Sequence, residues 1–191
     1  PPSDLRIWVL KKSSGIGMGS ASMLKRTWGY VGFNTDSKVN DFFNNAIGLN
    51  LGLSIIASVT KFVQPDLTIS INNDNADTDD VFGLVFHECS HASHWTKVGN
   101  SYWVKYINYI ITYGAYGNGT GANAGYCGVG EMWGNYFGNF RLSRDEFGWQ
   151  NNWDASEDWY NPGFLRDVDD INDLSTTEIF SCLTSNTTTI D

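Results

Sequence analysis

The chain has few of the residues that mark several common classes of protein. Its 191 residues include only 4 prolines, 3 cysteines and 3 histidines. Three cysteines allow at most one internal disulfide bond, and Cys89 lies inside a histidine motif, where it suits a small apolar filler. Cys127 with Cys182 is the one pairing that remains open.

Positive charge and long apolar runs are also scarce. Lysine and arginine number 12 against 21 aspartates and glutamates, which gives a formal net charge of -9. An acidic surface repels phosphate backbones, so nucleic acid is not an expected partner. The most apolar stretch, residues 49–63, is interrupted by polar residues, whereas a spanning helix needs roughly 20 apolar residues. We expect no transmembrane segment in this chain.

The chain also lacks an initiator methionine and a charged-then-apolar leader, since it opens with Pro1, Pro2 and Ser3. We expect it to begin downstream of a processing site, or to be the C-terminal piece of a longer chain. Hydrophobic residues make up 41% and charged residues 17%, a balance that favours a folded chain with a sizeable core. We expect a single domain over residues 1–191.

Periodicity and turn residues place the other secondary elements. An alternating pattern at residues 67–72 predicts a half-exposed strand. Glycines at positions 15, 17 and 19 predict a flexible loop. The remaining expected elements are strands at residues 5–11, 28–33 and 53–63, a helix at 36–47, and a capped helix at 175–183. The tryptophans at 149, 153 and 159 are expected in the core and in a lid over it.

The most informative segment runs from Asp79 to Trp95, with Gly99 as its expected stop. It is apolar on nearly every side in its first turns, which predicts a buried helix. The same helix carries His87, Glu88 and His91. Burying a polar group without a partner costs on the order of 1 to 3 kcal/mol, so these side chains require a compensating interaction. A metal ion supplies one.

Residues four apart lie one turn apart on the same face of a helix, so His87 and His91 can converge on one zinc ion. Glu88 lies on an adjoining part of that face, where it can reach a metal-bound water. Zinc lowers the pKa of such a water to about 7, and a carboxylate beside it can accept the proton. We assign Glu88 the role of general base.

The third metal ligand has to come from elsewhere in the chain. His94 lies seven residues beyond His87, about 10 Å of helical rise, which is too far for a shared tetrahedral site. No other histidine exists, so a carboxylate is required. The best candidate is Glu131, with Asn135 one turn later to hydrogen-bond a ligand imidazole. Gly130, Gly134 and Gly138 recur beside them and suggest that the backbone of the His87 helix approaches closely.

These residues resemble the gluzincin clan of zinc metallopeptidases, which combines HExxH on one helix with a glutamate on a second. The matching positions are His87, Glu88, His91, Glu131 and Asn135. The resemblance covers roughly residues 67–142. It implies that the strand at 67–72 is an antiparallel edge strand that binds extended peptide through Thr68, Ile69, Ser70 and Ile71. A looser likeness links the chain to zinc metallopeptidases exported by gut Bacteroidetes.

Two positions depart from the gluzincin pattern. Asn135 replaces the usual aspartate, so a neutral amide would orient the ligand histidine. The tyrosine or histidine that stabilises the oxyanion has no diagnostic spacing here, although Tyr126, Tyr136 and Tyr160 are among the candidates.

The expected fold is α+β and zincin-like, with a twisted, mostly antiparallel sheet packed on the His87 helix and the Glu131 helix. The expected function is zinc-dependent hydrolysis of peptide bonds by an exported protein at the periplasm, the cell surface or the extracellular space. Two alternatives stay open: an inactive zinc-containing binding module, and a zinc amidase that acts on a non-protein amide.

Overall fold

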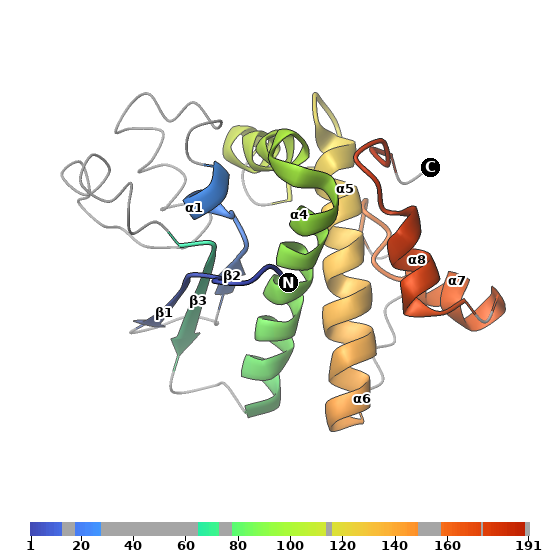
Figure 1. The fold of residues 1–191 in the computed structure, drawn as a ribbon, viewed down its shortest axis with the longest axis horizontal. Coiled ribbons are helices and arrows are strands. Elements are labelled where there is room, and N and C mark those ends of the chain that lie inside the picture. Colours follow the sequence, from blue (N-terminus) through green and yellow to red (C-terminus); the bar gives the residue numbers. More distant parts are fainter. Residues whose placement is uncertain are drawn as a thin grey trace.

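The computed structural model describes residues 1–12, 18–27, 65–72, 78–113, 116–148, 158–172 and 174–189. In this part of the chain a small sheet lies beside a larger set of helices, so the fold is α+β as expected (Figure 1). The elements expected at residues 28–33, 36–47 and 53–63, and Trp149 and Trp153, lie outside the described residues.

The sheet contains β1 (Ile7–Lys12), β2 (Met18–Ser20) and β3 (Leu67–Asn72), in the order β1-β3-β2. β1 pairs parallel with β3, and β2 pairs antiparallel with it. The sheet is therefore mixed, and the prediction of a mostly antiparallel sheet is wrong for these strands. Strand periodicity does not specify neighbours, and here β3 inserts between the two strands that precede it. Gly19, expected in a flexible loop, belongs to β2.

β3 is the central strand of the described sheet, so the prediction of a peptide-binding edge strand at Thr68, Ile69, Ser70 and Ile71 is wrong. The first three of these residues have partners on both sides, and all three are buried. The alternating pattern suggested one exposed face. Short hydroxyl side chains can be buried when they hydrogen-bond, and Thr68 Oγ1 donates to the Ser20 carbonyl at 3.4 Å.

Helix α4 (Thr78–Tyr113) carries the histidine motif in its first part. Asp79 and Asp80 lie in its first turn, where their negative charge suits the positive end of the helix dipole. The helix is interrupted at Gly99, whose φ of 77° lies in the left-handed region that glycine adopts without strain. The expected stop is thus confirmed as a kink, beyond which a second helical segment continues to Tyr113.

The first part of α4 forms one helical rod, and a second rod runs beside it (Figure 1). It consists of α5 (Ala124–Trp133), the π-helix η2 (Gly134–Leu142) and α6 (Ser143–Phe147). π-Helical turns are rare in proteins overall, but many of those that occur lie at functional sites. Glu131 lies on α5, close to the junction with η2.

Two apolar clusters fix these elements in place. One joins the sheet to α4 and includes Met23, Leu67, Trp103 and Ile107, with Trp159 packed against it. The other joins α5 and η2 to α7 (Phe164–Asn172) and α8 (Thr176–Cys182). α8 begins with a capping box in which Ser175 and Glu178 bond each other's backbone N–H groups, which confirms the expected capped helix.

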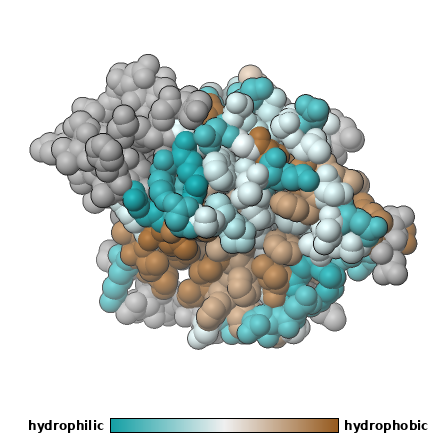
Figure 2. All heavy atoms as spheres, in the orientation of Figure 1, coloured by the Kyte–Doolittle hydropathy of each residue, from teal (hydrophilic) through white to brown (hydrophobic). Residues whose placement is uncertain are grey.

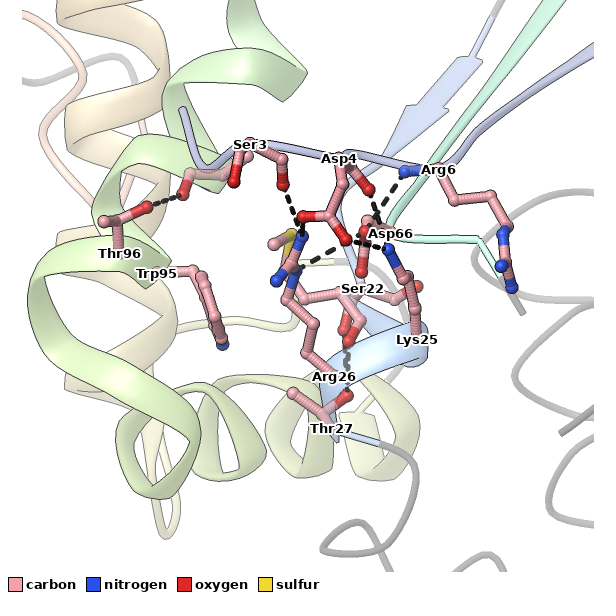
Figure 3. A network of polar contacts seen from close by, with 12 residues as sticks. Ser3, Asp4, Arg6, Ser22, Lys25, Arg26, Thr27, Asp66, Trp95 and Thr96 are labelled. Atoms are coloured by element: carbon pink, nitrogen blue, oxygen red, sulfur yellow. Dashed lines mark hydrogen bonds and ion pairs between the residues drawn. The ribbon is translucent and has the colours of Figure 1, made fainter. Parts of the chain in front are cut away.

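A charged network ties the N-terminal segment to α1 (Leu24–Thr27) and α4 (Figure 3). Asp4 accepts hydrogen bonds from Lys25 and Arg26 at 2.7 and 3.0 Å. Arg26 also lies 3.5 Å from the buried carboxylate of Asp66 and stacks over the ring of Trp95 on α4. These contacts hold the sheet against the helix that carries the histidines.

Apolar surface is concentrated on the lower half of the face shown in Figure 2, across the strands of the sheet and the first turns of α4 (Figures 1 and 2). Phe82 and Phe86 of α4 contact the ring of Phe147 on α6. No helix among the described residues combines the length and the hydropathy that crossing a membrane requires.

Cys89, Cys127 and Cys182 are all free thiols, so the open pairing of Cys127 with Cys182 does not form.

Candidate metal centre

His87 and His91 lie one turn apart on the buried face of α4. They are 7% and 2% exposed, and their rings meet edge to face with centroids 4.5 Å apart. The two Nε2 atoms are 2.9 Å apart. Both imidazoles therefore present the same nitrogen to one point, as the four-residue spacing predicts.

Glu131 of α5 faces that point from the second rod. Its Oε2 lies 3.5 Å from His87 Nε2 and 3.6 Å from His91 Nε2, and it has no hydrogen-bond partner among the described residues. Burial alone would raise the pKa of Glu131, but the two histidines outweigh burial and lower it. A buried carboxylate oxygen directed at two imidazoles is an arrangement suited to a cation.

The separations between the three atoms fit a single ion. Ligand atoms roughly 2.0–2.2 Å from a tetrahedral zinc ion lie about 3.3–3.6 Å from one another. Two of the three distances match this range, and the third, between the histidines, is shorter at 2.9 Å. These three residues are the only group of this kind among the described residues, and they can hold a metal ion. Two imidazoles and one carboxylate suit zinc and also ferrous iron.

Glycines of the second rod allow it to approach α4 closely at the candidate metal group. A Cβ atom at Gly134 would lie 2.6 Å from His91 Cε1 and 3.0 Å from His87 Cε1. One at Gly138 would lie 2.5 Å from the backbone of His87. The prediction that these glycines admit the His87 helix is confirmed for both. Gly130 instead faces the ring of Tyr106, with closest approach 3.0 Å.

Tyr106 is a site residue that the sequence interpretation missed. It lies beyond the kink in α4, and its hydroxyl donates a hydrogen bond of 2.5 Å to Glu131 Oε1. Burial and the Glu131 charge hold the pKa of Tyr106 well above its usual range, so it remains a donor. No spacing rule connects a residue beyond a kink with a carboxylate 25 residues later. Only the fold reveals the pair.

The hydrogen bond to a ligand imidazole comes from a different asparagine than expected. Asn135 Nδ2 donates to the backbone carbonyl of Glu131 at 2.9 Å and does not contact an imidazole in the described bonds. Asn139 Nδ2 instead lies 3.4 Å from His87 Nδ1 and donates to Asn135 Oδ1 at 2.9 Å. Gly138 packs on the backbone of His87, so the residue after it, Asn139, lies beside that imidazole.

Glu88, the expected general base, is buried beneath strand β2. It is 4% exposed, and its Oε2 has no hydrogen-bond partner among the described residues. Burial raises the pKa of Glu88 to about 8, with His87 opposing and Glu131 adding to the rise. A Cβ atom at Gly19 would overlap Glu88 Oε1, so only glycine lets β2 pass over this carboxylate.

His94 takes no part in the candidate metal group, as the helical-rise argument predicts. It is fully buried, and its ring packs edge-on against Tyr102 and Trp103. Neither ring nitrogen has a hydrogen-bond partner among the described residues, and burial lowers the pKa of His94 to about 3. His94 is therefore a neutral core residue.

Two of the tyrosines considered for oxyanion stabilisation are hydrogen-bonded elsewhere, since Tyr126 accepts from Lys105 and Tyr160 donates to Asp158. Tyr136 is buried in the second apolar cluster, where its hydroxyl has no hydrogen-bond partner among the described residues. Tyr116, which the sequence interpretation did not single out, differs from them. Glu131 is the main cause that raises its pKa, and the residue is 43% exposed, so this phenol is accessible and interacts with the charge of a site carboxylate.

With this geometry established, the chain was compared with protein-family models, characterised proteins and solved structures, and none of them matches.

Proposed function

We propose that this chain is a zinc-dependent hydrolase of peptide bonds, similar in its site to the gluzincin metallopeptidases. One observation carries the proposal. Nitrogen atoms of His87 and His91 and an oxygen of Glu131, from two separate helices, converge within 3.6 Å, and the buried Glu88 follows His87 on the same helix. A buried carboxylate beside a metal group favours hydrolysis over the other uses of this donor set.

Each residue has a defined task in this proposal. His87, His91 and Glu131 hold zinc, which when bound supplies a Lewis acid that polarises a carbonyl and acidifies water. Glu88 accepts a proton from the attacking water as the new carbon–oxygen bond forms. It then delivers that proton to the departing nitrogen as the carbon–nitrogen bond breaks. A pKa raised to about 8 makes the ionised form of Glu88 a stronger base, and that form predominates only above this pH.

In this proposal an extended substrate pairs with β2, and not with β3 as the sequence predicted. β2 is an edge strand of the described sheet, and its Gly19 lies directly over Glu88. An extended peptide that pairs with this edge would have its backbone close to the general base.

A second candidate is a zinc-holding binding module without catalysis. The observation that favours it is the cover over Glu88, which leaves the carboxylate only 4% exposed. In this case zinc stabilises the contact between the two rods and no substrate reaches Glu88.

A peptide library separates the two candidates. We expect the zinc-loaded wild type to cleave it, and Glu88→Gln to keep zinc while losing about 100- to 10,000-fold in rate. Glu146→Gln, at an exposed position on α6, is the matched control and should cleave like the wild type. A wild type that binds zinc but cleaves nothing refutes catalysis and favours the binding module. A Glu88→Gln variant that cleaves as well as the wild type refutes the role of Glu88 as general base.

A further inference from the structure

A chain of asparagine side chains connects the metal ligands of the two rods. It begins at the backbone carbonyl of Glu131, which accepts from Asn135 Nδ2 at 2.9 Å. Asn135 Oδ1 in turn accepts from Asn139 Nδ2, also at 2.9 Å, and that NH₂ group lies 3.4 Å from His87 Nδ1. Gly138 makes the contact possible, because without a side chain it lets η2 approach the backbone of His87.

The first hydrogen bond of this asparagine network determines which atom donates and which accepts in the others. A carbonyl can only accept, so Asn135 directs its NH₂ group to Glu131 and its oxygen to Asn139. Asn139 must then present its NH₂ group, which also faces His87 Nδ1. A donor at this place favours a lone pair on Nδ1 and the imidazole proton on Nε2. There the proton can be shared with His91 Nε2, 2.9 Å away.

Metal binding at His87 Nε2 requires the opposite tautomer. The proton leaves Nε2 and one proton is taken up at Nδ1, so the ring remains neutral. Nδ1–H then needs an acceptor, but it faces the NH₂ group of Asn139. A half-turn of the amide exchanges its nitrogen and oxygen and supplies that acceptor.

On the basis of the proposed metal site, we propose that Asn139 is a positioning residue whose amide turns with the tautomer of His87. In the metal-free chain the NH₂ group of Asn139 completes the asparagine chain. In the metal-bound chain its oxygen accepts from His87 Nδ1–H and holds the ring toward the ion. Asn135, the residue predicted for this role, anchors Asn139 only before the turn, because the turned amide would present its oxygen to Asn135 Oδ1 and give up that hydrogen bond.

This account predicts opposite effects for one substitution. Asn139→Asp places only acceptors beside His87 and Asn135, so metal binding gains a stronger partner while the metal-free chain loses a donor. We expect the Zn²⁺ affinity of Asn139→Asp to rise about tenfold and its metal-free stability to fall. Asn139→Ala removes both groups, and its Zn²⁺ affinity should fall about 10- to 100-fold, as for other outer partners of metal ligands.

The experiment measures Zn²⁺ affinity by competition with a chromophoric chelator, and urea stability of the metal-free proteins. Asn186→Asp, at an exposed position, adds the same charge and should leave both quantities unchanged. Nitrogen NMR of the 3 histidines should show one ring moving its proton from Nε2 to Nδ1 when Zn²⁺ is added.

Tighter Zn²⁺ binding with lower metal-free stability in Asn139→Asp supports the proposal. Equal affinities in wild type and both variants overturn it. Weaker binding in Asn139→Asp that follows its loss of stability also overturns it, because a merely structural role would produce that result. A wild type that binds no Zn²⁺ refutes the metal site itself, a failure distinct from these.

Discussion

The hydroxyl of Tyr106 donates to Oε1 of Glu131 at 2.5 Å, from the part of α4 that follows the kink at Gly99. The other carboxylate oxygen of Glu131 faces His87 and His91. Tyr106 thereby fixes which oxygen remains for a metal ion, and it links the second segment of α4 to the centre formed by the first.

Tyr106→Phe should weaken metal binding. The substitution keeps the ring, which stacks on Trp103 with centroids 4.5 Å apart, but leaves Glu131 Oε1 buried without its donor. We expect Zn²⁺ affinity to fall about tenfold and the free energy of unfolding to fall by about 1–3 kcal/mol. Tyr102→Phe, on the same helix as Tyr106, is the matched control, because it removes a hydroxyl hydrogen bond to the Thr187 carbonyl. Equal Zn²⁺ affinities in the two variants would contradict the role of Tyr106.

Gly134→Ala should disrupt the centre by steric overlap. Its new methyl group would lie 2.6 Å from His91 Cε1 and 2.9 Å from His91 Nε2, so the ring must move or the rods must separate. We expect a stability loss of about 1–3 kcal/mol and a large loss of Zn²⁺ affinity. Gly130→Ala meets the ring of Tyr106 at 3.0 Å and His94 Nδ1 at 3.9 Å, and should bind Zn²⁺ better than Gly134→Ala. Calorimetric titration decides the order, and the reverse order would refute this packing.

The local features of the centre could be predicted from the sequence because they depend on helical spacing. Four residues separate His87 from His91, and the glycine register marks the face that α4 approaches. His87, Glu88 and His91 were expected to be buried in an apolar helix, so they required a compensating partner. This requirement favoured a metal ion with Glu131 as its third ligand.

Other features depend on contacts that no local pattern encodes. Tyr106 reaches Glu131 only because α4 bends at Gly99. Asn139 takes the place expected for Asn135 because Gly138, the residue before it, packs on the backbone of His87. The order of strands was also unpredictable, since alternation identifies β3 as a strand but not as the central one.

His94 should make the metal-free protein less stable as the pH falls. Burial lowers its pKa from 6.5 to about 3, so between these values the unfolded chain binds a proton that the folded chain does not. Stability conferred by neutral His94 is therefore complete above about pH 6.5 and is lost toward pH 3, at about 1.4 kcal/mol per pH unit. Urea unfolding of the wild type and of His94→Gln measures this. Identical pH slopes in the two proteins would exclude His94 as the cause.

Tyr116→Phe should slow hydrolysis without affecting the metal. The Tyr116 phenol is protonated at neutral pH, as tyrosines ordinarily are, and Glu131 raises its pKa further, so it can donate to a developing oxyanion. We expect kcat to fall about 100- to 1,000-fold with unchanged Zn²⁺ content. Tyr160→Phe is the control, because its hydroxyl already donates to Asp158. If the two variants lose the same activity, Tyr116 has no special part.

The central claim is that His87, His91 and Glu131 together hold one metal ion, and metal analysis after reconstitution with Zn²⁺ tests it most directly. The account predicts about one zinc per wild-type chain, one in His94→Gln, and a loss of zinc in His91→Ala and Glu131→Ala. Circular dichroism should show that these variants remain folded. A wild type without zinc, or a folded Glu131→Ala variant that keeps its full zinc content, would contradict the claim.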